Sequence, residues 1–284
     1  MEKYYVINID NLEITYHADC GTREYLATHD HIDLKDIWLQ RKMSRHYYNE
    51  FEIWCYDYNE TKGLYSRMVG YLNFESPNPH RGEIYINYCN EALYSDFIIG
   101  ARFYLEEVLN LKFLRISKLD IAADFNFNIQ RYILKSYKDL DYELLINGEV
   151  VNESCVHGVG VYAGNNPRNR LFAKPSLDFA NKNKTLTMRV YDKLKEIKEE
   201  SNKTYILERD GFTRIYRVEM TCKNHKVLYK SLVRLGLSDE DLYSMLDDHN
   251  VLQKLFTDLM NRLVRLRKNR TVYNLLYHAI KDLE

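Results

Sequence analysis

The spacing of apolar residues switches between a two-residue and a three- to four-residue repeat along the chain. Loose alternation of apolar and polar residues, broken by turn-forming stretches, predicts strands over residues 4–89. From Leu93 to Leu109 apolar residues recur at three- and four-residue steps, which predicts an amphipathic helix of about 20 residues. Alternation returns over residues 113–127, and a short helix is expected over residues 129–140. Strands and helices are therefore intermixed.

The second half of the chain continues this mixture and then becomes helical. Strands are predicted over residues 142–151, 155–162, 185–191 and 213–222, with a helix over residues 192–201. All of the sequence after His225 reads as helices, including residues 238–246 and 251–266. The first of these two segments opens with a Ser-Asp-Glu-Asp capping pattern. Few strict βαβ units occur, so we expect an α+β fold with an antiparallel sheet, packed helices and a helical C-terminal region. We expect a mixed domain over residues 1–225 and the helical region over residues 226–284.

Composition narrows the class of protein. A chain of 284 residues can bury a core without disulfide or metal support. Its five cysteines lie far apart with no Cys-x-x-Cys pair, which favours reduced thiols. No apolar run approaches the ~18 residues that cross a bilayer, and the first residues lack a signal-peptide pattern. We therefore expect a cytoplasmic protein without a membrane partner.

Charge is balanced overall but unevenly distributed. The formal net charge is -1, which argues against blanket attraction to nucleic acid. Residues 151–284 hold 24 Lys and Arg against 17 Asp and Glu, a surplus of about +7, and the first half is correspondingly acidic. This asymmetry permits a basic face on the second half, although such a surplus is more often a solvated surface.

The strand around residues 115–127 carries acids at unusual positions. Side chains alternate across a strand, so Asp120 and Asp124 share a face opposite Leu119 and Ile121. An ideal strand separates the two acids by about 13 Å, too far for both to bind one ion unless the strand twists or bends. Aspartate is depleted in strands, so its presence here calls for a partner or a function.

Two further strands have the same division into an apolar and a polar face. On the strand over residues 185–191, Thr187, Arg189 and Tyr191 share the polar face, with Lys193 following. On the strand over residues 213–222 the polar face carries Arg217, Glu219 and Thr221. Overlaying the polar faces would gather carboxylates, a tyrosine hydroxyl, an arginine and a lysine on one surface of a sheet.

Such a collection suits metal-assisted chemistry on a phosphate. Carboxylate oxygens are the ligands that Mg²⁺ or Mn²⁺ prefers, and the ion would act as a Lewis acid on a phosphate oxygen. A neighbouring tyrosine could be the nucleophile, and Lys193 could steady the phosphate or assist proton transfer. The competing interpretation is an ordinary strand surface of salt-bridged pairs, which is the commoner origin of mixed charges.

Three segments, in order, resemble a known family. They are Ile116-Ser-Lys-Leu-Asp-Ile-Ala-Ala-Asp-Phe125, Met188-Arg-Val-Tyr-Asp-Lys-Leu-Lys-Glu196 and Tyr216-Arg-Val-Glu-Met220. Together they resemble the replication initiation factor family of rolling-circle plasmids and mobile elements, relatives of the pT181-type Rep proteins. The similarity covers roughly residues 60–225. Lys118 stands where the family has arginine, and a long polar insertion precedes Lys184.

The resemblance implies a divergent form of the histidine-hydrophobe-histidine nuclease fold. It implies an enzyme that nicks one DNA strand, leaving a 5′-phosphotyrosine and a free 3′-hydroxyl. By position in the motifs, Tyr191 matches the nucleophile, with Tyr162 as the second candidate. Asp120, Asp124 and Glu219 match the acids that hold Mg²⁺ or Mn²⁺, and Lys193 and Glu196 match accompanying polar positions.

The expected partner is origin DNA, both double-stranded and single-stranded, and the resemblance adds a host helicase. Two functions compete with replication initiation, namely a relaxase for conjugative transfer and a non-catalytic DNA-binding regulator of the same fold. Cations of the polar strand faces and of the C-terminal run 262–270 could contact phosphates. These are Arg189, Arg217, Arg262, Arg265, Arg267 and Lys268. An amphipathic bundle with a cationic exterior explains the run equally well, and its leucines pack within the chain or in a homodimer.

Overall fold

The computed structural model describes residues 5–42, 49–59, 63–74, 82–138, 142–150, 176–244 and 248–275. The chain divides into two compact units. The first unit comprises Met1–Asn8 and Asp120–Glu284, and the second comprises Ile9–Leu119. Strands β1 (Tyr5–His17) and β7 (Lys112–Phe125) contribute residues to both units.

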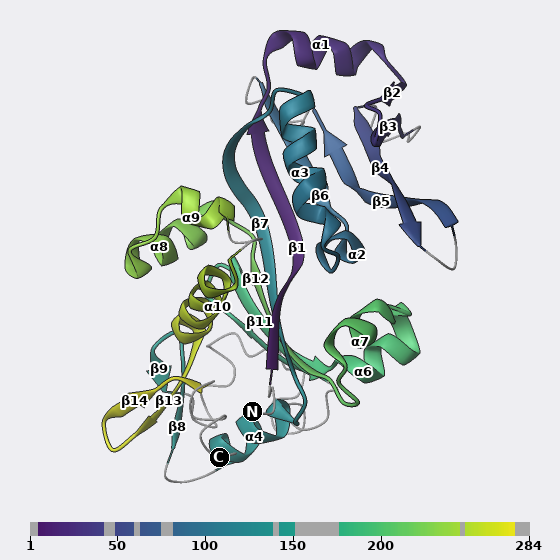
Figure 1. Ribbon diagram of the computed structural model, residues 1–284. Helices are drawn as coiled ribbons and strands as arrows, with labels where there is room; N and C mark the ends of the chain where they lie inside the picture. Colours follow the sequence, from purple (N-terminus) through teal and green to yellow (C-terminus); the bar gives the residue numbers. More distant parts are fainter. Residues whose placement is uncertain are drawn as a thin grey trace. The chain divides into compact units, whose positions relative to one another are not determined.

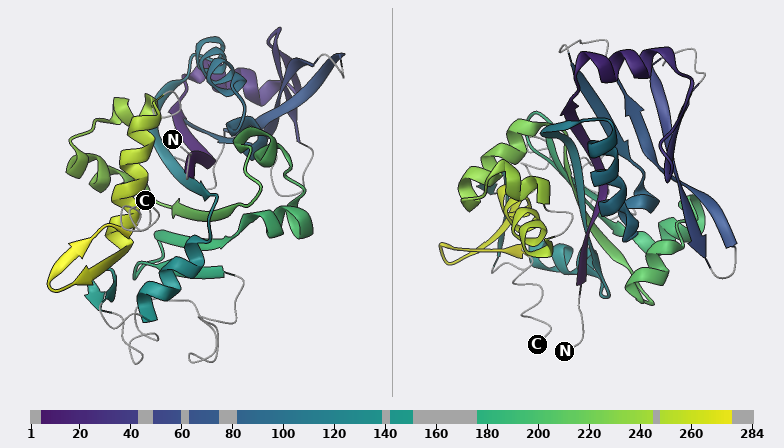
Figure 2. Two further views of the ribbon diagram at one scale, coloured as in Figure 1. Left: turned by 60° about the horizontal axis from the view of Figure 1, so that its bottom comes forward. Right: turned by 45° about the horizontal axis from the view of Figure 1, so that its top comes forward.

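The second unit is an antiparallel sheet with a helix along one face. From β7 the strand order is β7-β1-β6-β5-β4-β3-β2, and the chain links sequential strands through short turns and helices. Helix α3 (Phe97–Val108) lies along β1 (Figure 2). The Tyr16 hydroxyl of β1 donates a 2.8 Å hydrogen bond to Oε1 of Glu106 on this helix. The elements are β2 (His31–Asp33), β3 (Ile37–Arg41), β4 (Glu50–Asn59), β5 (Gly63–Asn73), β6 (Glu83–Tyr88), α1 (Cys20–Thr28), α2 (Asn90–Leu93) and α3 (Phe97–Val108).

The first unit places three further strands beside β7, in the order β10-β11-β12-β7. Figure 1 labels β11, β12 and β7 of this group. Strands β10 (Ser176–Ala180), β11 (Leu186–Asp192) and β12 (Tyr216–Cys222) pair antiparallel. In the β11–β12 pair, Met188 faces Met220 and Val190 faces Val218, and all four are buried. Because side chains alternate, the residues between them lie on the other face of the sheet.

Helices cover the apolar face of this sheet. Helix α10 (His249–Leu263) packs against β11 and β12 and begins at Asp248, whose side chain accepts the backbone N–H groups of Asn250 and Val251. Leu255, Phe256 and Leu259 of α10 are completely buried, each burial stabilising the fold by roughly 1.5–3 kcal/mol. The other helices of this unit are α4 (Ile129–Lys138), α6 (Lys193–Glu196), the π-helical turn η2 (Ile197–Ser201), α7 (Tyr205–Asp210), α8 (His225–Leu235) and α9 (Asp239–Ser244).

A second, four-stranded sheet has the order β14-β13-β8-β9. It contains β8 (Glu143–Ile146), β9 (Glu149–Val150), β13 (Val264–Lys268) and β14 (Thr271–Tyr273). Strand β13 follows α10 directly, and Asn269 and Arg270 form the turn to β14 with φ of 49° and 69°. Strand β13 pairs with β8, so residues before and after position 225 belong to one sheet. Residue 225, the predicted boundary, lies inside the first unit.

The expected α+β class with a large antiparallel sheet and packed helices is confirmed. The expectation that all residues after His225 are helical is wrong for residues 264–273, which form the β13–β14 hairpin. The predicted strand over residues 155–162 lies outside the described residues. Across the described ranges, no helix combines the length and the apolar character needed to cross a membrane.

Candidate active site

Tyr191 lies where a strand changes into a helix. Strand β11 ends at Asp192, and the Asp192 carboxylate accepts a 2.9 Å hydrogen bond from the backbone N–H of Lys195. An aspartate in this position satisfies one of the unpaired donors at the start of a helix, which is why α6 begins at Lys193. Tyr191 is therefore held by the β11–β12 ladder on one side and by the helix start on the other.

The Tyr191 hydroxyl has a carboxylate acceptor. It donates a 2.9 Å hydrogen bond to Oε2 of Glu219, which lies on the neighbouring strand β12. The register places Tyr191 directly opposite Arg217 and places Arg189 opposite Glu219. Tyr191 and Glu219 are diagonal neighbours across the two strands, and their hydrogen bond shows that both side chains lie on the same face of the sheet. This confirms the predicted faces of the two strands. A hydroxyl bonded to a carboxylate is the arrangement in which the carboxylate can remove the proton.

Two cations flank the Tyr191 ring. The Arg189 guanidinium carbon lies 5.7 Å from the ring centroid and Lys193 Nζ lies 5.8 Å from it. Cations near an aromatic ring are attracted to its electrons and favour negative charge developing on a phenol. Arg189 is exposed and forms a 3.1 Å ion pair with Asp178, and although its partial burial would lower its pKa, the Asp178 charge raises it.

Lys193 is almost completely buried, with 2% of its side chain exposed. Its ammonium forms a close ion pair with Glu196, one helical turn further along. Burial alone would raise the pKa of Glu196, but the hydrogen bond and charge of Lys193 outweigh burial and lower that pKa. Lys193 has almost no exposed surface with which to contact a phosphate, and its charge lies beside the Tyr191 ring.

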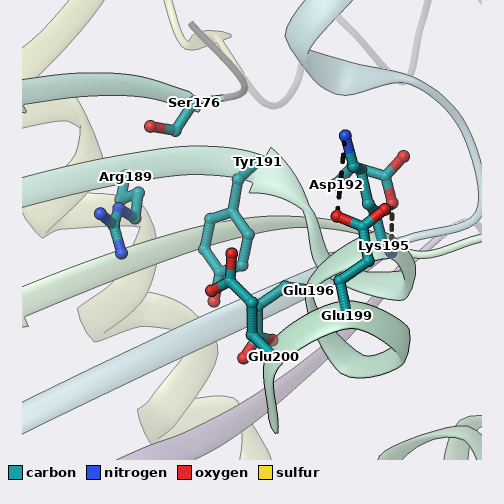
Figure 3. A pocket seen from close by; sticks show the side chains of 8 residues that line it. All are labelled: Ser176, Arg189, Tyr191, Asp192, Lys195, Glu196, Glu199 and Glu200. Carbon is teal, nitrogen blue, oxygen red and sulfur yellow. Dashed lines mark hydrogen bonds and ion pairs between the residues drawn. The ribbon is translucent and has the colours of Figure 1, made fainter.

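Tyr191 opens onto a pocket of about 260 Å³ (Figure 3). Figure 3 shows Arg189 on one side of the Tyr191 ring and Asp192 with Lys195 on the other. Four carboxylates and two cations line the space, so it is acidic, and a phosphate would be best accommodated on the Arg189 side. The lining residues are Ser176, Arg189, Tyr191, Asp192, Lys195, Glu196, Glu199 and Glu200.

Asp124 and Arg217 form a buried ion pair. Arg217 donates from Nε to Asp124 Oδ1 and from Nη2 to Asp124 Oδ2, both at 2.7 Å, and neither side chain is exposed. This two-bond fork is the strongest geometry available to an arginine and a carboxylate. The structure corrects the prediction that Arg217 contacts DNA, because a completely buried guanidinium offers no surface to a phosphate. It also gives Asp124 a cationic side chain as partner in place of a metal ion.

The three predicted metal ligands do not form a metal centre in this structure. Asp120 is 8% exposed and lies four residues, or two strand repeats, from Asp124, which is engaged by Arg217. Glu219 accepts the Tyr191 hydroxyl. Throughout the described part of the chain, no three His, Cys, Asp or Glu side chains are arranged to hold a metal ion. The predicted need for Mg²⁺ or Mn²⁺ therefore stays a prediction, without a set of ligands.

The cations of the C-terminal run that are predicted to contact DNA lie on two elements, α10 and β13. Arg262 lies on α10 and donates to the Val227 carbonyl at 2.8 Å and to Ser231 Oγ at 2.7 Å, so it ties α10 to α8. On β13, Arg267 donates a 2.5 Å hydrogen bond to Glu143, and Lys268 Nζ lies 4.9 Å from the Tyr142 ring centroid. Arg265 lies on the same strand, is partly exposed, and pairs through its backbone with Leu145.

Two features of the site escaped the sequence analysis. One is the acidic lining from α6 and η2, namely Glu199 and Glu200, which follow Glu196 at helical spacing. A helical wheel of residues 192–201 would have placed these side chains near the end of the strand. The other is the pairing of Asp124 with Arg217, which are 93 positions apart in sequence. Tyr162, the second candidate nucleophile, lies outside the described residues.

Comparison with known proteins gives a distant structural similarity. No protein-family model matches the chain, and no curated protein matches it in sequence. A solved structure described as a rolling circle replication initiator protein from Geobacillus stearothermophilus aligns with 98% of this chain and 96% of its own. The TM-score is 0.45 and the sequence identity is 11%, so the similarity is too weak to assign a family or a function.

Proposed function

We propose that this protein is a DNA nicking and joining enzyme that initiates rolling-circle replication through a phosphotyrosine at Tyr191. The observation that carries the proposal is the hydrogen bond of 2.9 Å from the Tyr191 hydroxyl to Glu219, at the edge of an open pocket. The order of the three sequence motifs supports the same reading, because Tyr191 and Glu219 occupy the motif positions that match a nucleophile and an acid.

The chemistry follows from the geometry. Glu219 removes the hydroxyl proton, and the Tyr191 oxygen attacks the phosphorus of one phosphodiester. The bond from phosphorus to the 3′-oxygen breaks, and the 3′-oxygen takes a proton from a water molecule. The resulting hydroxide takes the proton held by Glu219, and a 5′-phosphotyrosine remains. Joining reverses these steps when a 3′-hydroxyl attacks the phosphotyrosine. Atoms and charge balance without an external oxidant or energy source.

Each cation near the ring has a separate part in this scheme. Arg189 is exposed on the pocket wall and pairs with Asp178, so it can exchange that carboxylate for a DNA phosphate. Lys193 is buried against Glu196 and stabilises the developing negative charge of the phenol from the protein side. The substrate is origin DNA, met first as a duplex and cut as a single strand, and a host helicase would extend the opened region.

The experiment uses supercoiled DNA that carries candidate origin sequences from the protein's own genetic element. Incubation with Mn²⁺ or Mg²⁺ should convert this DNA to open circles with protein attached. Peptide mass spectrometry should then find a nucleotide joined through its 5′-phosphate to Tyr191. Omitting the cation tests the predicted metal requirement. Tight binding without a nick would support the non-catalytic regulator instead. A cut mapped to a transfer origin would support the relaxase.

A further inference from the structure

Helix α8 carries positive charge and no negative charge. Its 11 residues include Lys226, Lys230 and Arg234 and no acidic residue. These three residues recur at four-residue steps, so they form one row along the helix. All three are exposed, whereas Leu228 and Leu232 are buried where the helix packs on α10 and β12. The helix therefore turns an apolar face inward and a cationic face to solvent.

The fold does not compensate this row of charge. Neither Lys226 nor Lys230 forms an ion pair or a side-chain hydrogen bond with any described residue. Arg234 makes one bond of 3.1 Å, from Nη1 to Asp258 Oδ1, and its side chain remains 55% exposed. Like charges four residues apart on a helix repel each other, and Lys226 lies in the first turn, where the helix dipole favours an acid. The row therefore does not serve to stabilise α8.

Two uncharged side chains lie beside the cations. Tyr229 is 52% exposed and Val233 is 64% exposed. Tyr229 follows Lys226 by three residues and Val233 follows Lys230 by three, so each lies next to the row on the helix surface. Lysine, arginine and tyrosine are among the side chains that contact phosphates and sugars in protein–DNA complexes. The exposed face of α8 combines all three.

We propose that this cationic face of α8 binds the sugar–phosphate backbone of duplex DNA. From Lys226 to Arg234 the row extends about 12 Å along the helix axis, at about 1.5 Å per residue. One strand of a duplex presents a phosphate every ~3.4 Å along its axis, so the row can face about three or four phosphates. Contacts of this kind do not depend on base sequence. The inference rests on the proposed function only in taking DNA as the substrate.

This surface is separate from the pocket beside Tyr191. In the β11–β12 ladder Tyr191 lies opposite Arg217, whereas α8 follows the other end of β12, after Cys222. Roughly 17 Å of strand separates Arg217 from Cys222, at ~3.3 Å per residue. Among the residues found to line the pocket, none belongs to α8. The surface therefore contributes to binding the duplex and not to the chemical step.

Two neighbouring features narrow the choice of partner. The apolar side of α8 is buried in the protein, which leaves only Tyr229 and Val233 to enter a lipid layer, so an anionic membrane is the poorer partner. Helix α9, which Figure 1 labels next to α8, follows the C-terminal end of α8 and carries the exposed Glu240. The N-terminal part of the row, with Lys226 and Lys230, is therefore the more favourable to a phosphate.

The test measures binding of the full-length protein to a duplex of random sequence, by fluorescence anisotropy at several salt concentrations. Lys226→Gln/Lys230→Gln should lower the slope of log affinity against log salt by about two, and the affinity at ~0.1 M salt by about 10- to 100-fold. Lys226→Arg/Lys230→Arg should keep the wild-type slope. The matched control, Lys35→Gln/Lys112→Gln, removes the same charge from two exposed lysines of the second unit and should also keep that slope.

Two results of these titrations would overturn the proposal. One is an unchanged slope in Lys226→Gln/Lys230→Gln, and the other is an equal decrease in Lys35→Gln/Lys112→Gln, which would reflect net charge alone. Binding of the same variants to vesicles of phosphatidylserine and phosphatidylcholine is measured in parallel. Loss of vesicle binding with intact duplex binding would assign the face to an anionic membrane and would also overturn the proposal.

The failure of this inference and the failure of the nicking proposal are distinguishable, because binding to a random duplex requires neither an origin nor a cut. If the wild-type protein never attaches covalently to origin DNA but the salt slopes behave as expected, the nicking proposal fails and the α8 surface stands. If Tyr191 attaches to DNA and the slope does not depend on Lys226 and Lys230, the nicking proposal stands and the α8 surface fails.

Discussion

The two units each contain a tyrosine bonded to a carboxylate on a neighbouring strand, yet their surroundings differ. In the second unit, Tyr65 of β5 lies opposite Asp57 of β4 and donates a 2.8 Å hydrogen bond to Asp57 Oδ2. In the first unit, Tyr191 donates to Glu219 at 2.9 Å. A hydrogen bond from a tyrosine to a carboxylate is therefore a common way to satisfy a half-buried phenol, and it does not identify a nucleophile by itself.

The position of the arginine separates the two cases. Arg67 donates a 2.6 Å hydrogen bond to the Tyr65 oxygen and lies 3.3 Å from Asp57, so the three groups form a closed cluster. Burial first, and then the hydrogen bond to Asp57, raise the pKa of Tyr65. Beside Tyr191, Arg189 lies at the ring and on the wall of an open pocket. The first arrangement keeps a phenol protonated, and the second places a phenol where a substrate can reach it.

Replacing each tyrosine by phenylalanine gives the largest contrast. Tyr191→Phe should abolish the covalent DNA adduct and leave duplex binding nearly intact, because only the attacking oxygen is removed. Tyr65→Phe is the matched control and should retain the adduct. Denaturing gels of labelled origin DNA give the first quantity and filter binding the second. An adduct of full yield in Tyr191→Phe would move the nucleophile elsewhere, first to Tyr162.

Replacing Asp124 and Asp57 by alanine tests how the burial of each ion pair affects stability. Asp124→Ala removes the carboxylate to which the completely buried Arg217 donates two hydrogen bonds, and it should cost about 3–5 kcal/mol in the free energy of unfolding. Asp57→Ala breaks a pair whose side chains are 22% and 30% exposed, so the cost should be about 1 kcal/mol or less. Urea denaturation of both variants gives the two values. Equal costs would mean that the Arg217 pair is solvated in solution.

The proposed base should have a large effect on rate and a small one on stability. Glu219→Gln keeps the shape of the side chain but cannot accept the proton, so covalent attachment should slow by about 10²-fold. Asp57→Asn makes the same change beside Tyr65 and should leave the rate unchanged. Single-turnover attachment kinetics at fixed pH distinguish the two variants. A normal rate in Glu219→Gln would assign the proton to another acceptor.

The smallest effect is expected on strand β13, which lies outside the pocket beside Tyr191. Arg265→Ala should weaken DNA binding a few-fold and reduce the slope of log affinity against log salt by about one. Arg262→Ala should instead destabilise the packing of α10 on α8, because Arg262 bonds to the Val227 carbonyl and Ser231. Salt titrations of DNA binding and thermal unfolding are measured for both variants. Together they distinguish the loss of a phosphate contact from the loss of helix packing. An unchanged salt slope in Arg265→Ala would exclude a phosphate contact there.

Local patterns predicted the strands of the site and the faces that their side chains share. Alternation placed Tyr191 with Arg189, and Glu219 with Arg217, and the strand register confirms both. The change from strand to helix after Tyr191 was also readable, because Asp192 is a good helix start. These features depend on neighbours in sequence, which is why the sequence alone contains them.

Contacts between residues far apart in the sequence could not be predicted from the sequence. Nothing local shows that Asp124 would meet Arg217, since this depends on β7 lying beside β12. The same limit explains the error after Leu263. Val264 and Leu266 fit a helix that continues the leucine spacing of α10, and they fit a strand equally well. Pairing of β13 with β8 decides between the two, and that partner lies more than a hundred residues earlier.

The antiparallel register of β11 against β12 limits how this protein can vary. Losing or gaining one residue inside β11 would turn Tyr191 to the face of Met220 and Val218, and the same change inside β12 would turn Glu219 to that face. A substitution changes one side chain of a strand, whereas a change of length reverses the faces of all the side chains that follow it in that strand. We therefore expect changes of length in this region to be tolerated only in the connections, such as the turn from Asn181 to Lys184 between β10 and β11.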